Sequence, residues 1–220
     1  MKFVCVLSCL SLLLAAAAAG YPYPCASPPL LTGGISLVAD GQSLAGTLIY
    51  DAYGQKVRVK TEGFAGNGTF SLEQLLLFHE EVYFEIDWKK FSCRKKKLDS
   101  GFSPLQVDPE AKPTGQVILG SSSSSGMGVL VSSWQGELPG NGTYFTNFSE
   151  IGCIPITYAA FGPEFGFTFL STYNWVIGIF NPNDLQIPPI CAFAQMEKSG
   201  KPDTFFSALA SLARQTARSD

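Results

Sequence analysis

The segment 47–93 constrains the fold more than any other part of the chain, because strongly apolar residues recur along it with a fixed period. In 57–60 and again in 83–87 they occupy every second position, which is the pattern of a strand with one solvated face. Gly54 lies between two such runs and can supply the positive φ that a tight reversal needs. The segment is therefore predicted to form antiparallel strands joined by hairpins.

Strand patterns of this kind recur from Ile35 to Phe180, and little of the chain has the period of a helix. The strands are separated by turn-forming segments rich in Gly, Pro, Asn and Asp, at 33–34, 40–41, 66–68, 99–101, 139–142 and 181–184. This organisation predicts an all-β fold of antiparallel strands, arranged as two stacked sheets or as a partly open barrel.

Only the last part of the chain predicts a helix. Asp203 or Thr204 can cap the segment 205–213, in which apolar residues recur at positions i, i+3, i+4 and i+7. This short C-terminal helix could pack on the sheet or fray as a loose tail, and the sequence does not choose between the two.

The N-terminal segment 1–20 has one positive charge, an apolar run and small residues, the pattern of a cleaved secretory signal peptide. The remaining chain has 14 basic and 18 acidic residues, a net charge of −4, so nucleic acid is not an expected partner. The basic run 94–97 is interpreted as a solvated strand end or as a contact with acidic lipid headgroups. A soluble protein of the extracellular space or of an organelle lumen is expected.

Removal of the signal peptide leaves four cysteines, namely Cys25, Cys93, Cys153 and Cys191. Their even number and wide spacing predict two disulfides rather than a metal site. Four cysteines allow three pairings, and the spacing alone does not select one of them.

His79 is the only histidine of the chain, so any histidine-dependent catalytic triad has to use it. The sequence has no Gly-x-Ser-x-Gly elbow and no Gly-rich phosphate loop, and it lacks the usual sets of zinc ligands. Hydrolysis by paired carboxylates needs no local signature and is the enzymatic alternative that remains. The lack of these catalytic, phosphate-binding and zinc-binding motifs favours a binding protein that is not an enzyme and requires no cofactor.

The richest apolar region lies between Phe161 and Phe180, and it is interpreted as two strands paired in a hairpin around 171–174. Bulky side chains at every second position either fill a plain core or line a cavity between a curved sheet and its covering elements. The cavity hypothesis assigns eight residues to an apolar ligand site: Phe84, Ile86, Phe165, Phe167, Phe169, Trp175, Ile177 and Ile179.

Several motifs together resemble the ependymin family, and within it the vertebrate ependymin-related proteins. They are the 50–59 hairpin, the 84–87 strand, Cys-Ile-Pro at 153–155, and Pro-Pro-Ile-Cys with Ala-Gln-Met-Glu within 188–197. The resemblance covers 21–198 as one ependymin-like β domain. The helical or disordered tail 199–220 has no counterpart in the family.

The resemblance implies two stacked antiparallel sheets with a deep hydrophobic pocket, similar to bacterial lipoprotein carriers. It implies a dimeric, secreted or lysosomal glycoprotein that binds anionic lipids, gangliosides and calcium. It also implies that Cys25 pairs with Cys153 and Cys93 with Cys191. A third bridge of some relatives is absent, because this chain lacks both of its cysteines.

We therefore expect a glycosylated homodimer, secreted or lysosomal, that binds lipids in a hydrophobic pocket and contacts membrane surfaces transiently. The alternative is an extracellular, calcium-dependent adhesion or matrix protein without a ligand cavity. A negative net charge opposes anionic membranes at neutral pH. Protonation of carboxylates relieves this repulsion, so lipid binding is expected to strengthen at acidic pH.

The acceptor pattern Asn-x-Ser/Thr predicts N-glycans at Asn67, Asn141 and Asn147. Calcium could be bound by the oxygen ligands of Asn183 and Asp184. The same Asn-Pro-Asn-Asp segment is also ordinary turn chemistry.

Overall fold

The structure is a computed structural model that describes residues 22–39, 42–65, 68–138, 140–163, 166–179, 181–197 and 208. The signal peptide and all of the predicted tail except Ala208 lie outside these residues. No helix in the described part of the chain is long and apolar enough to cross a lipid bilayer.

Eleven strands make up nearly all of the regular structure within the described residues. They are β1 (Leu30–Ala39), β2 (Gln42–Asp51), β3 (Lys56–Ala65), β4 (Gly68–Leu77), β5 (Val82–Asp87), β6 (Ser92–Lys97), β7 (Lys112–Gly120), β8 (Gly128–Leu138), β9 (Gly142–Ser149), β10 (Pro155–Gly162) and β11 (Gly166–Ile177). Two short 3₁₀ helices follow, η1 (Pro182–Leu185) and η2 (Pro189–Cys191).

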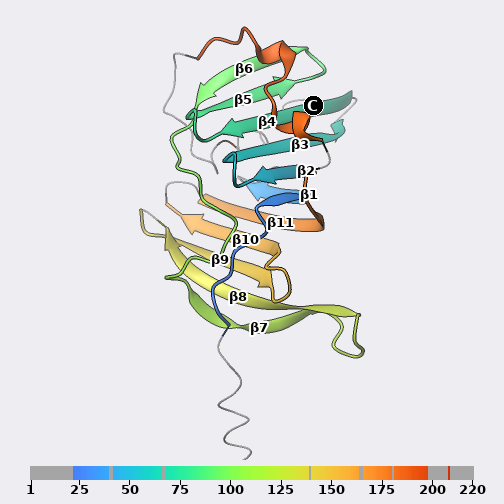
Figure 1. Cartoon of the computed structure of the whole chain (residues 1–220), viewed down its shortest axis with the longest axis vertical. Helices are drawn as coiled ribbons and strands as arrows, with labels where there is room; N and C mark the ends of the chain where they lie inside the picture. Colours follow the sequence, from blue (N-terminus) through green and yellow to red (C-terminus); the bar gives the residue numbers. More distant parts are fainter. Residues whose placement is uncertain are drawn as a thin grey trace, which may run out of the picture.

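The strands pair antiparallel in one continuous sheet, in the order β6-β5-β4-β3-β2-β1-β11-β10-β9-β8-β7 (Figure 1). The predicted all-β, antiparallel fold is confirmed. The sheet is open, because the described order ends at β6 on one side and at β7 on the other.

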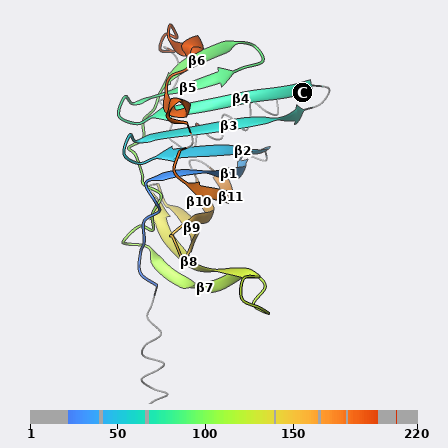
Figure 2. The same ribbon diagram turned by 45° about the vertical axis from the view of Figure 1, so that its right-hand side comes forward.

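The sheet consists of two meanders, β1–β6 and β7–β11, in which each strand pairs with its neighbour in sequence. The meanders are joined where β1 pairs with β11, for example at Leu31 and Ile177. Both ribbon views show these two strands side by side in the middle of the sheet (Figure 2). A long connection, 98–111, leads from β6 to β7.

The side chains of each strand alternate between two faces of the sheet. We call face A the side that carries Leu31, Ile35 and Leu37 of β1, all of which are buried. On the first meander, face A carries the largest apolar cluster, against which Phe102 and Leu105 of the long connection pack. On the second meander, face A carries a smaller cluster around Trp134, Tyr144 and Phe148.

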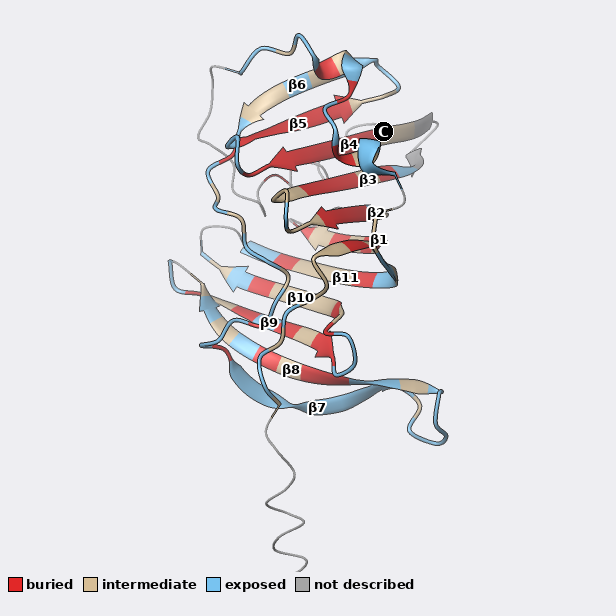
Figure 3. Ribbon diagram, in the orientation of Figure 1, coloured by how far each residue is buried: buried red, intermediate tan, exposed pale blue. Residues whose placement is uncertain are grey.

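Face B is the opposite side of the sheet. On the first meander it carries a third apolar cluster, formed by Ile49, Leu75, Leu77, Val82, Phe84 and Ile86 with Leu185 and Cys191. The segment 179–197, which we call the C-terminal segment, therefore covers face B there. The middle of the first meander is consequently buried on both sides, as the mostly buried residues of β3, β4 and β5 show (Figure 3).

Both disulfides implied by the family resemblance are present. Cys25 is bonded to Cys153, with 5.9 Å between the Cα atoms, and Cys93 is bonded to Cys191, with 5.3 Å between them. The first ties the N-terminal segment to the second meander. The second ties the C-terminal segment to β6.

The region expected to form a hairpin around 171–174 instead lies within the single strand β11. The register of β11 against β1 shifts between Thr32 and Gly34, where Asn174 has a φ of +53°. A bulge of this kind inserts one residue into a strand and reverses the side on which later residues point. The hairpin prediction was wrong because the polar segment 171–174 includes a bulge rather than a turn.

Candidate functional site

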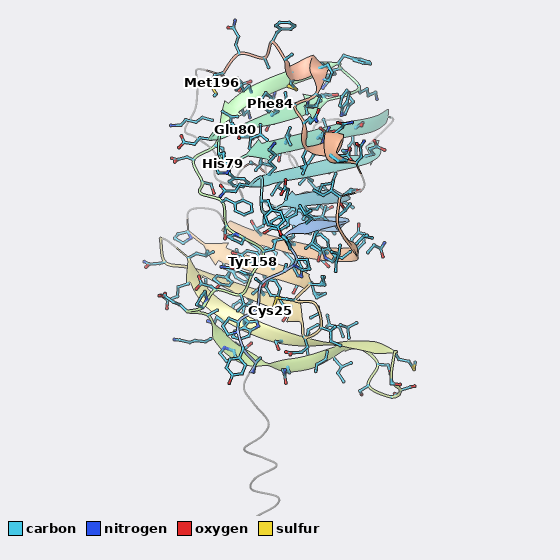
Figure 4. The ribbon with its side chains drawn as sticks, viewed as in Figure 1. Cys25, His79, Glu80, Phe84, Tyr158 and Met196 are labelled. Atoms are coloured by element: carbon cyan, nitrogen blue, oxygen red, sulfur yellow. A yellow bond between two sulfur atoms is a disulfide. The ribbon has the colours of Figure 1, made fainter. Side chains whose placement is uncertain are left out.

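The predicted pocket residues do not converge on one cavity. Phe84 and Ile86 are buried in the apolar cluster of face B, and Ile179 packs against that cluster. Figure 4 shows Phe84 within the first meander. Phe84 and Ile86 fill a core beneath the C-terminal segment, so for these two residues the pocket hypothesis is corrected to a packing role, whereas Ile179 is only partly buried.

The bulge at Asn174 separates the remaining pocket candidates. Trp175 packs into the face A cluster, where its ring lies against Gly33. Ile177 is 70% exposed at the end of β11. Phe169 is half-buried on β11, and Phe165 lies outside the described residues. The shared face that a strict period of two predicts is therefore not formed.

A row of partly exposed aromatic rings crosses face B of the second meander. Phe145 of β9, Phe161 of β10 and Phe167 of β11 are each 43–47% exposed. The ring centroids of Phe145 and Phe161 lie 6.3 Å apart, and those of Phe161 and Phe167 lie 5.0 Å apart. We call these three residues the aromatic patch. Only Phe167 was predicted as a ligand-site residue, because the patch depends on which strands become neighbours.

The neighbours of the aromatic patch on face B include Gln135, Ala159 and the half-buried Phe169. Across the strand pairs, Phe145 is opposite Gln135 and Ala159, and Phe167 is opposite Phe161. The C-terminal segment covers face B on the first meander but leaves the patch partly exposed on the second. Partly exposed aromatic rings in mutual contact are typical of interaction sites.

A cleft of about 440 Å³ adjoins the C-terminal segment. Ile179 is the predicted pocket residue in its lining, which mixes apolar and charged groups: Leu30, Asp51, Tyr53, Lys56, Ile179, Pro182, Leu185 and Gln186.

The residues suggested for calcium form a turn that is bound to basic side chains. Asn181 caps η1 by accepting a hydrogen bond from the backbone N–H of Asn183. The side-chain carboxylate of Asp184 lies 2.7 Å from Nζ of Lys60. The backbone carbonyl oxygen of Asp184 accepts a hydrogen bond from the guanidinium of Arg58. A carboxylate already paired with an ammonium group is poorly suited to a second cation. These contacts favour the turn interpretation of 181–184, and calcium binding by Asn183 and Asp184 stays a prediction.

Arg58 and Glu73 form a buried ion pair beneath the C-terminal segment. Their side chains are 7% and 4% exposed, and Nη2 of Arg58 contacts Oε1 of Glu73. Trp88 donates a hydrogen bond of 3.1 Å from Nε1 to Oε2 of Glu73. The buried carboxylate of Glu73 is therefore paired with a positive charge and accepts a hydrogen bond from Trp88, as a buried charge requires.

The basic run 94–97 is divided between the two faces of β6. On face A, Arg94 and Lys96 pair with the buried carboxylate of Glu85, at 2.8 and 3.1 Å. On face B, Nζ of Lys95 lies 5.7 Å from the ring centroid of Phe84. These contacts favour the interpretation of the run as part of a strand.

His79 is exposed in the turn between β4 and β5, next to exposed Glu80 (Figure 4). No cluster of three or more His, Cys, Asp or Glu side chains suited to a metal ion occurs among the described residues.

On face A of the second meander, the Tyr144 and Tyr158 rings stack with their centroids 5.5 Å apart. Burial raises the pKa of Tyr158, with a smaller contribution from Tyr144, so the stacked phenol stays uncharged.

The three glycosylation candidates have different surroundings. Asn141 is exposed in the turn before β9, with a φ of +61°. Asn147 lies within β9, and its side-chain amide donates a hydrogen bond of 2.6 Å to Oγ1 of Thr157. Asn67 lies outside the described residues. Modification at each site stays a prediction.

Comparison with known proteins places this fold in a family. A family model described as Ependymin matches residues 66–191. Ependymin-2 of Carassius auratus is 29% identical over 214 residues, which cover 93% of this chain and 96% of that protein. Ependymin of Notemigonus crysoleucas is 28% identical over 209 residues, with the same two coverages.

Among solved structures, an uncharacterized conserved protein from Thermus thermophilus has a similar fold. The TM-score is 0.50 at 10% sequence identity, over 80% of this chain and 90% of that chain. This likeness concerns the fold alone. The family model, in contrast, matches more than half of the sequence, so the chain belongs to the ependymin family.

Proposed function

We propose that the protein is a non-catalytic lipid-binding protein that contacts acyl chains through the aromatic patch. The observation that supports this proposal is the set of three touching phenylalanine rings on face B, each 43–47% exposed. Transfer of apolar surface from water to a lipid chain is favourable by about 25 cal/mol per Å². The family resemblance, which implies binding of anionic lipids and gangliosides, supports the same ligand class.

The proposal includes a preference for anionic lipids at low pH, as expected in lysosomes. The net charge of −4 after signal-peptide removal opposes binding to anionic vesicles at neutral pH. Protonation of exposed carboxylates lowers this repulsion without the need for a histidine switch. The two disulfides fit a protein of an oxidising compartment outside the cytosol.

Substitution Phe161→Ser tests the proposal, because Phe161 contacts both other rings of the patch. Loss of one phenylalanine contact of about 1.5–3 kcal/mol is expected to weaken vesicle binding by about tenfold or more. Binding is measured by co-sedimentation with neutral and with anionic vesicles, from about pH 4.5 to about pH 7.5. Phe91→Ser is the matched control, because Phe91 is 77% exposed in the turn between β5 and β6.

Equal binding by both variants and the unaltered protein would remove the aromatic patch from the lipid site. Equal binding of neutral and anionic vesicles at every pH would contradict the headgroup and pH parts of the proposal. Calcium-dependent self-association without vesicle binding would instead favour the adhesion or matrix function.

We also propose that the protein forms a homodimer, and that it does so through the hairpin of β7 and β8. Every residue of β7 is exposed, as its uniform colour in Figure 3 shows, and β7 is the last strand of the described sheet. No charged residue occurs between Lys112 and Glu137. Lys112 and Pro113 protect the start of β7, but the rest of this edge strand lacks the charges that keep natural sheet edges from pairing. Its exposed apolar side chains are Val117, Ile118, Leu119, Met127, Val129 and Leu130.

A second copy fits this surface because antiparallel pairing of two β7 strands about a two-fold axis brings uncharged, apolar residues together. Ile118→Asp would place like charges close together across that axis, and we expect it to convert the dimer to a monomer. Sedimentation equilibrium measures the change, and Ser123→Asp in the exposed loop of the same hairpin is the control. A dimer that persists in Ile118→Asp would exclude this interface.

A further inference from the structure

A predicted N-glycosylation site lies on the same face of the sheet as the aromatic patch. Asn147 and Phe145 are two positions apart in β9, and the pairing of β9 with β8 continues without a shift from Gly142 to Ser149. Alternate residues of a strand point to the same side and are about 7 Å apart along the strand. The side chain of Asn147 is therefore on face B, in the position next to Phe145.

The neighbouring strand β10 has the same order of residues. Thr157 is opposite Asn147, and Ala159 is opposite Phe145. Phe161 follows Ala159 at the next alternate position of β10 and contacts Phe145. The pair of Asn147 and Thr157 thus directly adjoins the patch on two strands.

The side-chain amide of Asn147 can carry a glycan and keep its contact with β10. Its Nδ2 donates a hydrogen bond of 2.6 Å to Oγ1 of Thr157. In glycan transfer, Nδ2 loses one proton and bonds to C1 of the sugar, while the lipid diphosphate of the donor leaves. An asparagine amide has two N–H donors, so one of them remains. That N–H can still bond to Thr157, which would hold the linkage amide in a fixed orientation.

The chain itself fills the space on the other side of Asn147. Ser149, the next residue of β9 on face B, is buried, and its hydroxyl donates to the carbonyl oxygen of Ile151. The same hydroxyl accepts a hydrogen bond from the backbone N–H of Ile154. Because the turn after β9 occupies that side, a bulky group on Asn147 has room toward the solvent and toward the aromatic patch.

We propose that an N-glycan on Asn147 lies over the aromatic patch and shields it. The face of a phenylalanine ring is apolar and can stack against the C–H face of a sugar ring. The three rings are each 43–47% exposed, and a bulky, solubilising glycan keeps such a surface from associating. The glycan then regulates lipid access to the patch. This regulation rests on the proposed lipid function, whereas the shielding does not.

Asn147→Gln in protein from a eukaryotic secretory host tests the shield. A dye that fluoresces on apolar surfaces is expected to brighten about twofold or more. Anionic vesicles at about pH 4.5 are expected to bind at least about threefold more tightly. Addition of Phe161→Ser to the same protein should remove most of the added dye fluorescence, which assigns it to the patch.

The matched control is the same substitution in protein made with glycan transfer blocked. There the unaltered chain and Asn147→Gln should give equal dye fluorescence, because neither carries the shield. Full enzymatic release of the glycans from the folded, unaltered protein repeats the dye comparison without a substitution, and it decides the matter if Asn147→Gln does not fold.

Peptide mass spectrometry of the unaltered glycoprotein shows whether Asn147 is modified, and an unmodified Asn147 would overturn the proposal. So would equal dye fluorescence of the glycosylated protein and Asn147→Gln, even where Phe161→Ser still weakens vesicle binding and the lipid function stands. A brighter dye signal without tighter vesicle binding would support the shield and overturn its role in lipid access.

Discussion

Glu73→Ala is expected to lower the free energy of unfolding by about 3–5 kcal/mol. The substitution leaves the guanidinium of Arg58 buried, with an exposed side-chain fraction of only 7% and without its carboxylate partner. The remaining hydrogen bond from Arg58 to the carbonyl of Asp184 does not neutralise the charge. Trp88 also loses the acceptor for its indole N–H. Urea denaturation followed by circular dichroism measures the loss.

A double substitution separates the energy of the pair from the cost of a lone buried charge. Arg58→Met combined with Glu73→Leu replaces both charges by apolar groups, and we expect a change of less than about 1 kcal/mol or a gain in stability. A loss below about 1 kcal/mol in Glu73→Ala alone would show that water reaches Arg58. In that case, the C-terminal segment would not seal face B.

Replacement of Cys93 and Cys191 by serine is expected to destabilise the protein by about 4–5 kcal/mol in the chain-entropy account of disulfides. The bond joins residues 98 positions apart, so its loss releases a long loop in the unfolded chain. It also removes the covalent tie between the C-terminal segment and β6, and the apolar cluster of face B should then bind a fluorescent dye. Denaturation without reductant measures the first effect, and dye fluorescence in native buffer measures the second.

The other disulfide is the control for the second effect. Cys25→Ser with Cys153→Ser removes a bond across 128 positions, so a similar loss of stability is expected. This bond lies in the second meander, and face B of the first should stay covered. Equal dye binding by both double variants would contradict a local role of the Cys93–Cys191 bond in holding the C-terminal segment.

The alternation around Val57 and Val59 predicted the strands of the first meander, because side-chain direction follows directly from position in a strand. It also predicted that Arg58 and Lys60 face solvent, and for Arg58 this is wrong. The cover comes from Asp184 and its neighbours, more than 120 positions later in the chain. No local pattern contains that information, so a period of two gives the face of a residue but not its burial.

The aromatic residues near the end of the domain show a second limit. Phe167 and Trp175 are separated by an even number of positions and would share a face in a regular strand. The bulge at Asn174 places them on opposite faces, and a bulge depends on how β1 and β11 pair. The aromatic patch likewise needs β9, β10 and β11 to be neighbours. The family resemblance predicted both disulfides correctly but gave no information about the patch.

The pairing of β1 with β11 also determines when this fold can be completed. Leu31 and Ile177 are partners although 146 positions separate them. At synthesis rates of about 5–20 residues per second, β1 waits roughly ten to thirty seconds for its second neighbour. The β1–β6 meander can form in that time from local hairpins, with one edge still unpaired. That edge is where a nascent chain would be most susceptible to aggregation, and its closure by β11 is expected to be the slow step of folding.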